Sequence, residues 1–201
     1  GDRRFEYANV MKGDNVANSD ITASGNISGV TTLTLADVGG TATFAGDVDV
    51  ATLAIGNTVA NVAINGNGST ITNDIDFAND GTLQLGDATG DTLTFNGGLD
   101  TSSVGSTVTL NGTIATSNDA VTFGAVTLGS ATTIDTNATN TTGDITIGAV
   151  TGGSNTLTLT TENNIANADI TASGNISGVT TLTLTSVGGT ATFAGDVDVA
   201  T

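Results

Sequence analysis

The sequence predicts an all-β fold and, within that class, a β-solenoid, in which short strands stack turn upon turn along one axis. Three observations lead to this prediction: apolar residues alternate with polar ones, turn dipeptides recur about every ten residues, and helix-forming residues are scarce. Two alternatives stay open at this stage, β-sandwich domains in series and an intertwined trimeric fibre β-helix.

The alternation is clearest in eight four-residue segments. In each, apolar side chains point to one side and Thr, Asp or, in one segment, Gln to the other, as a strand with one dry and one wet face requires. The segments are Thr32–Leu35, Thr41–Phe44, Asp47–Val50, Thr82–Leu85, Thr92–Phe95, Thr107–Leu110, Asp144–Ile147 and Thr156–Leu159.

Glycine dipeptides separate the predicted strands. Asn-Gly and Asp-Gly adopt positive φ at low cost, so the chain can turn a corner at each of them. Eighteen of the 20 acidic residues are Asp, which favours turns over helices, and we therefore expect almost no helix. The dipeptides are Asn65-Gly66, Asn67-Gly68, Asp80-Gly81, Gly97-Gly98, Asn111-Gly112 and Gly152-Gly153.

A long internal repeat divides the chain. Residues 17–52 recur as residues 166–201, at an offset of 149 positions. We expect an N-terminal cap or connector at residues 1–14, a β-repeat unit at 15–163, and the start of a second, truncated copy at 164–201. Because the second copy stops in mid-pattern, we expect the natural polypeptide to continue or this end to join another copy. The copies differ only at Ser19/Ala168, Ala36/Thr185 and Asp37/Ser186.

The size of the predicted core residues favours a solenoid over a sandwich. A sandwich usually needs several large aromatic residues to fill its ~10 Å interior. This chain has six Phe, one Tyr and no Trp, and its alternating positions hold mainly Val, Ile, Leu and Ala. With about 20 to 30 residues per turn, a repeat unit would contain about five to seven turns.

The composition excludes several classes of function. The chain has no His, Cys, Trp or Pro, and its only cations are Arg3, Arg4 and Lys12. Without the usual general base and thiolate nucleophile, we expect no enzymatic activity. The net charge of −17 argues against nucleic acid as a partner, because Lys and Arg dominate phosphate binding. No apolar run reaches membrane-spanning length, so we expect no membrane insertion.

The segment Thr141–Thr161, TTGDITIGAVTGGSNTLTLTT, resembles the strand repeats of very long bacterial surface proteins, the filamentous-haemagglutinin-like and autotransporter-passenger adhesins. This resemblance extends over nearly all of residues 15–201. It implies a right-handed parallel β-helix, export to the cell surface, and a role in adhesion, biofilm or surface coating. The segment Ile21–Gly29, ITASGNISG, also resembles repeats of phage tail fibres, in which three chains wind together.

Clusters of aspartate are the candidate Ca²⁺ ligands. Calcium binds several hard oxygen ligands, and carboxylates facing each other ~4.8 Å apart on adjacent turns would gain from a bridging cation. The alternative is a set of solvated acidic turns that keep an exported polymer soluble. We expect no other cofactor. The candidate ligands are Asp47, Asp49, Asp74, Asp76, Asp80, Asp87, Asp91, Asp196 and Asp198.

Two further sequence patterns indicate other functions, but more weakly. Tripeptides such as Thr32–Thr34, Thr92–Thr94 and Thr158–Thr160 predict outward threonine ladders, which stabilise a sheet and could also bind a ligand such as a glycan or ice. The Asp74/Asp76 pair could serve a glycosidase, which uses two carboxylates. The absence of Trp removes the usual sugar platform, so the pair does not change the expectation of a non-enzyme.

The first fourteen residues contain all the cations, the only Tyr and the only Met. A distinct segment at a solenoid end blunts or directs the exposed strand edge, so Phe5, Tyr7, Val10 and Met11 are the candidate contacts with another copy. A flexible leader is the alternative.

For the chain as a whole, we expect an extracellular structural or adhesive fibre that assembles with copies of itself, with cell-surface glycans as further partners. A ligand-binding surface module or a phage tail-fibre shaft is the alternative function.

Overall fold

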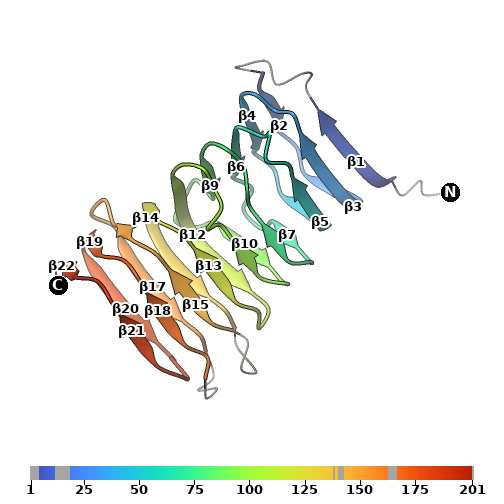
Figure 1. The fold of residues 1–201 in the computed structure, drawn as a ribbon. Helices are drawn as coiled ribbons and strands as arrows, with labels where there is room; N and C mark the ends of the chain where they lie inside the picture. The colour runs from blue at the N-terminus through green and yellow to red at the C-terminus, as the bar shows by residue number, and fades with distance from the viewer. Residues whose placement is uncertain (1–4, 12–18, 138, 140–142, 163–166, 201) are drawn as a thin grey trace.

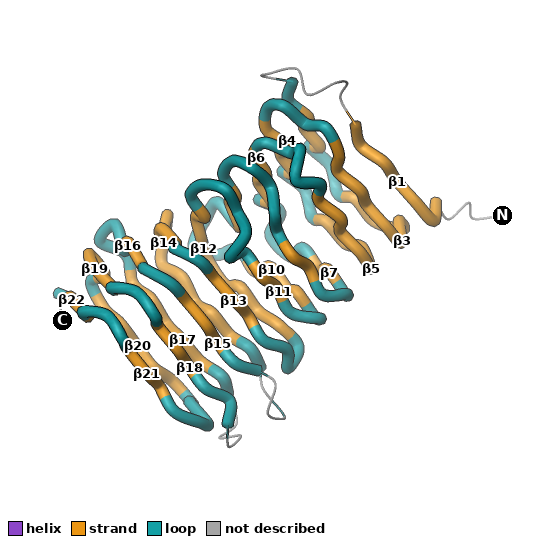
Figure 2. The backbone as a smooth tube through the Cα atoms, in the orientation of Figure 1, coloured by secondary structure: helices purple, strands orange, loops and turns teal. Residues whose placement is uncertain are grey.

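The computed structural model describes residues 5–11, 19–137, 139, 143–162 and 167–200. This part of the chain contains 22 strands and no helix (Figure 2). The strands lie across the long axis of an elongated stack, with β1 (Phe5–Met11) at one end and β22 (Val197–Val199) at the other (Figure 1). The all-β prediction is confirmed. No helix that could cross a membrane is found in the described ranges.

The strands pair in parallel with those of the neighbouring turn, and about eight turns stack as a β-solenoid. The neighbouring strands of a serial sandwich would be antiparallel, so that alternative is wrong. One chain supplies every side of each turn, so three intertwined chains are not needed to close the core. We name the three sides face I, face II and face III, in the order in which the chain follows them.

Face I is one ladder that runs the length of the stack. Its partner positions are 18 residues apart from Val108 to Val126 and 26 apart from Val150 to Ile176, so the turns differ in length. The turn lengths on this face fall within the expected 20 to 30 residues, except the 18-residue turn from Val108 to Val126. The strands are β2 (Ile21–Ala23), β4 (Thr41–Phe44), β6 (Asn61–Ile64), β9 (Leu83–Leu85), the first parts of β12 (Val108–Thr116) and β14 (Val126–Asp135), β16 (Val150–Thr151), β19 (Ile176–Val179) and β22.

Faces II and III complete each turn. Face II consists of the first parts of β3 (Ile27–Ala36) and β5 (Val48–Ile55), β7 (Thr70–Ile71), β10 (Thr92–Phe95), the second parts of β12 and β14, β17 (Thr156–Thr160) and β20 (Thr181–Thr185). Face III consists of the last parts of β3 and β5, then β8 (Ile75–Asp76), β11 (Leu99–Asp100), β13 (Val121–Phe123), β15 (Ile145–Ile147), β18 (Ile170–Ala172) and β21 (Ala191–Phe193).

The core is a narrow column of aliphatic side chains inside the three faces. In β10, Leu93 and Phe95 are fully buried, whereas Thr92 is exposed and Thr94 is half-buried, as the alternation predicts. The Phe77 and Phe95 rings meet edge to face, with centroids 6.2 Å apart. The column continues through successive turns as Leu93, Ile114, Ile134 and Leu159. Burial of apolar side chains on every turn is therefore the main favourable contribution to the free energy of folding.

Asp and Asn side chains hold the corners of adjacent turns together. Asp20 Oδ1 accepts the N–H of Thr41 (2.8 Å), and Asp169 Oδ1 accepts that of Thr190 (2.7 Å). Asn61 Oδ1 accepts the N–H of Thr82 (2.9 Å). Each bond joins residues 21 positions apart, one turn along the stack. These residues satisfy backbone donors where the strand ladder is interrupted.

The two copies of the repeat lie on different faces. Ile21 begins β2 on face I and pairs with Ala42, whereas its copy Ile170 begins β18 on face III and pairs with Ala191. From β2, six turns lead to β16 on face I, and two more faces lead to β18. In both copies the paired residues are therefore 21 positions apart, but each strand of the second copy lies one face away from its counterpart in the first copy. The same strand sequence can thus form more than one face of the solenoid.

Strand β1 is the outermost strand at the N-terminal end. Its backbone pairs with β3 from Phe5↔Val30 to Met11↔Ala36, along faces II and III. The cap or connector role of residues 1–14 stays a prediction. The predicted contact residues Phe5, Tyr7, Val10 and Met11 belong to this strand, but their side chains lie outside what the structure describes, so that role stays a prediction.

Candidate functional site

An acidic groove on face III is the feature that most resembles a site. It encloses about 370 Å³ and opens to solvent. Four carboxylates line it, and no Lys or Arg falls within the described ranges to balance them. The lining residues are Asp74, Asp76, Gly97, Leu99, Asp100, Asp119, Ala120 and Thr122.

Strand alternation and register build this acidic groove. Ile75 and Leu99 point into the core, so the next residues, Asp76 and Asp100, point outward and face each other across adjacent strands. Asp100 Oδ1 also accepts the N–H of Ser102 (2.7 Å). On later turns the same row continues as Thr122, Thr146, Thr171 and Thr192, so the acidic pair occupies only two turns of a polar row.

Of the nine predicted calcium ligands, only Asp74 and Asp76 lie in the acidic groove. Two others serve corners. Asp47 Oδ2 accepts a bond from Asn26 Nδ2 (2.9 Å), and the Asp47 N–H donates to Asn26 Oδ1 (3.1 Å). At the copied corner, the Asp196 N–H donates to Asn175 Oδ1 (3.0 Å).

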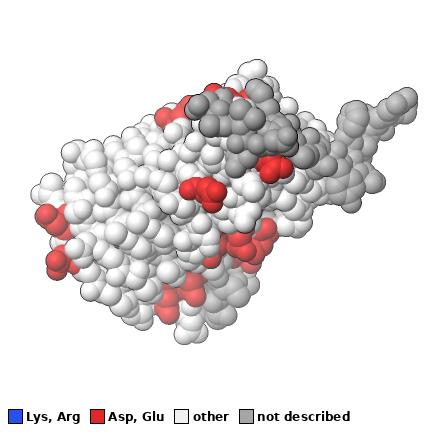
Figure 3. Space-filling model, turned by 45° about the horizontal axis from the view of Figure 1, so that its top comes forward, with Lys and Arg blue, Asp and Glu red and all other residues white. Residues whose placement is uncertain are grey.

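The other five candidates are dispersed. Asp49 lies on face II in register with Thr70, whereas its copy Asp198 lies in β22 on face I. Asp80 is exposed at a corner. Asp91 is buried, and its Oδ2 accepts the N–H groups of Asp87 (2.7 Å) and Ala88 (2.8 Å), so this pair shapes a loop. Acidic side chains accordingly form separate patches on the surface (Figure 3).

Sequence reasoning missed Asp100 and Asp119 as members of the acidic groove. The signal was the period-2 pattern, which marks Asp100 as outward, but its alignment with Asp76 depends on a 24-residue turn that the sequence does not reveal. Across the described ranges, no group of three or more acidic side chains is arranged to hold a metal ion. The calcium hypothesis therefore narrows to the Asp76/Asp100 pair and stays a prediction.

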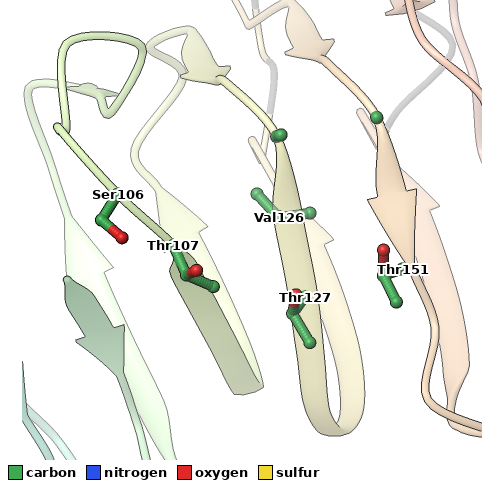
Figure 4. Close-up of a pocket in the computed structure, with 7 residues that line it drawn as sticks. Ser106, Thr107, Val126, Thr127 and Thr151 are labelled. Atoms are coloured by element: carbon green, nitrogen blue, oxygen red, sulfur yellow. The ribbon is translucent and has the colours of Figure 1, made fainter.

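A second shallow groove lies on face I and encloses about 330 Å³. Thr127 and Thr151 occupy matching positions on the adjacent strands β14 and β16, and Ser106 and Thr107 lie on the other side of β14 from Thr151 (Figure 4). Small side chains, Ala125 and Ala149, leave the space open. The predicted threonine ladders are also present on face II, in the row Thr92, Thr113, Thr133, Thr158 and Thr183.

Neither groove is lined by a cation or by an aromatic side chain. The acidic groove contains the Asp74/Asp76 pair that the sequence offered to a glycosidase. Comparison of the chain with protein-family profiles, with curated proteins and with solved structures finds no match. The fold and the surface chemistry of this chain therefore carry the functional argument.

Proposed function

We propose that this chain is a structural or adhesive component of an extracellular fibre and has no catalytic role. The supporting observation is the column of buried aliphatic residues that continues from turn to turn between parallel ladders. Such a column has no natural end point, because each turn buries its core against the next. Lengthening the stack therefore extends the structure without needing a new core.

The surface is consistent with this proposal. Exposed positions hold mainly Thr, Ser, Asp, Gly and Asn, and the grooves are open to solvent. A strongly acidic, polar exterior keeps a long polymer soluble and limits lateral aggregation. The row of threonines on face II adds cross-strand stabilisation on every turn.

Electron microscopy of the purified chain tests the proposal. About eight turns at ~4.8 Å give a monomer roughly 40 Å long. A fibre component is expected to form rods of constant width and many times this length, with a ~4.8 Å axial reflection in aligned samples. Immunogold labelling of intact producing cells should decorate their surface. Uniform particles of monomer length, or label confined inside the cells, would contradict the proposal.

A ligand-binding surface module is the second candidate, favoured by the Thr127/Thr151 groove and its regular hydroxyl rows. Hydroxyl groups at fixed spacing suit a ligand with its own regular period, such as a glycan chain. The same micrographs separate the two candidates, because such a module acts as single particles and only the fibre requires long rods.

We also propose that calcium stabilises the stack at the Asp76/Asp100 pair. The two carboxylates occupy matching positions on adjacent strands, and a divalent cation between them would replace repulsion with attraction. Adding CaCl₂ after chelation is expected to raise the Tm, with about 1 kcal/mol corresponding to roughly 2–4 °C for a chain of this size.

The Asp76→Asn variant provides the control for calcium. With one carboxylate removed, calcium should no longer change the Tm, while the chelated variant should melt at or above the chelated parent. A Tm that does not respond to calcium in the parent would dispose of this part of the proposal.

A further inference from the structure

Two buried polar atoms on adjacent turns, Asn79 Oδ1 and Thr101 Oγ1, have no hydrogen-bond partner among the described residues. Asn79 is 0% exposed and Thr101 is 2% exposed. An unpaired polar atom inside a protein destabilises the folded state, so nearly all such atoms bind another protein group or an ordered water molecule. The two atoms therefore point to a ligand inside the stack.

Asn79 occupies a corner position that holds valine on the neighbouring turns. The residue that follows each member of this row donates its backbone N–H to the carbonyl of the member one turn earlier. The Gly105 N–H, for example, donates to Asn79 O (2.9 Å). The row consists of Val38, Val59, Asn79 and Val104. Because valine fills the same position on other turns, the Asn79 amide must be explained by what it binds.

The amide nitrogen of Asn79 determines which of its atoms is left unpaired. Nδ2 donates to Ala60 O (3.2 Å) and to Thr82 O (3.0 Å), which uses both of its protons. Rotating the amide by half a turn would place Oδ1 against these two carbonyl oxygens, and both hydrogen bonds would be lost. Oδ1 is therefore an acceptor that needs a donor from elsewhere.

Thr101 brings a hydroxyl group into the core of the next turn. The strand register places Thr101 between Phe77 and Phe123 in an inward row on face III. Its backbone N–H donates to Thr122 O (2.8 Å). Neither phenyl ring offers a conventional hydrogen-bond partner, so the one donor and two acceptor sites of the hydroxyl stay unused.

A tight turn brings this hydroxyl and the Asn79 amide to the same corner, between faces III and I. The Val104 N–H donates to Thr101 O (3.2 Å), which closes the turn over residues 101–104. The bond from Gly105 to Asn79 O follows at once, so the turn lies against Asn79. Asn79 Oδ1 and Thr101 Oγ1 do not bond to each other. A small molecule that both donates and accepts would satisfy both atoms.

We propose that Asn79 and Thr101 hold one buried water molecule, which donates to Asn79 Oδ1 and accepts the proton of the Thr101 hydroxyl group. Water fits because both anchors are almost fully buried and one needs a donor. Two neutral oxygens are too few to bind a metal cation. The water joins adjacent turns, as the Asp20 carboxylate does through its bond to the Thr41 N–H at another corner.

The water site also supports one side of the acidic groove. Ser102 lies on the turn that starts at Thr101, and its N–H donates to Asp100 Oδ1 (2.7 Å). Loosening this turn would therefore also release Asp100. Hydrogen exchange at Ser102 and Val104 is expected to become faster when the water is removed.

The Thr101→Val variant tests the proposal, because it replaces the hydroxyl group with a methyl group of similar size. If the hydroxyl binds nothing, its removal relieves an unpaired polar atom, and the urea midpoint should rise. If the hydroxyl holds the water, the midpoint should fall, and this fall is the expected result. Thr132→Val is the matched control. Thr132 is equally buried, but its hydroxyl donates to Leu110 O (3.2 Å) or Ser130 O (3.0 Å), so its midpoint should fall in either case.

A high-resolution crystal structure locates the water directly. We expect one water molecule within about 2.7–3.2 Å of both Asn79 Oδ1 and Thr101 Oγ1 in the parent chain, and none there in Thr101→Val. Magnetic relaxation dispersion of water oxygen should detect one long-lived water fewer in the variant. An unchanged or higher urea midpoint for Thr101→Val would overturn the proposal. Electron density that shows the two side chains bonded directly, or no water between them, would also overturn it.

Discussion

The Gly66→Val variant is expected to lose about 3 kcal/mol of unfolding free energy, although it adds only a small apolar side chain. Gly66 is buried at the corner between faces I and II, against the backbone of Gly46 one turn earlier. The nearest atoms belong to backbone rather than to a flexible side chain, so two turns must separate to admit a Cβ. Urea unfolding followed by circular dichroism measures the loss.

Gly90→Val is the matched control for this prediction. Gly90 is exposed in a loop, and no atom lies within 4 Å of an added Cβ. Its substitution should change the unfolding free energy by less than about 0.5 kcal/mol. Equal losses for the two variants would show that backbone entropy, and not the close approach of turns, sets the cost at Gly66.

The glycines also show where sequence reasoning succeeds and where it stops. Gly68 and Gly98 have positive φ values of 119° and 94°, for the reason that the turn dipeptides suggested. Gly66 and Gly81 have the same sequence signature but no such φ. They are needed because another turn approaches them, and a partner about 20 residues away cannot be read from a dipeptide.

Strands were predictable and turn lengths were not. The eight alternating segments all contribute to strands, and Thr41–Phe44 and Thr92–Phe95 match strand boundaries. Asp47 and Asp144 instead lie just before strands, at corners. Alternation depends on neighbouring residues, whereas turn length depends on how many residues each corner holds. The acidic groove joins residues of different turns, so only its members Asp74 and Asp76 could be anticipated.

The rotation of the second repeat by one face follows from the same physics. Each face requires only small or medium apolar side chains that point inward and polar side chains that point outward. Strand sequences are therefore interchangeable among the faces. What fixes placement is the number of residues between Ile21 and Ile170, which spans six turns and two faces. A repeat defined by sequence is therefore not a whole number of turns, and its surface features move around the axis from copy to copy.

Phe95→Ala is expected to cost about 3–5 kcal/mol, the largest loss among single truncations in this core. Phe95 is 0% exposed in a middle turn, and its ring packs edge to face on Phe77, so truncation leaves a cavity and removes an aromatic contact. Because each turn is stabilised only by its neighbours, the defect should also uncouple the two halves of the stack and broaden the urea transition.

Phe193→Ala removes the same atoms from the last turn, where the ring is only partly buried. We expect a loss at least 1 kcal/mol smaller than for Phe95→Ala and no broadening, because no turn among the described residues lies beyond Phe193 to be uncoupled. Equal losses of unfolding free energy would mean that the contribution of a Phe side chain does not depend on whether its turn is covered by neighbours on both sides. A sharp, single transition in Phe95→Ala would mean that the stack unfolds as one unit.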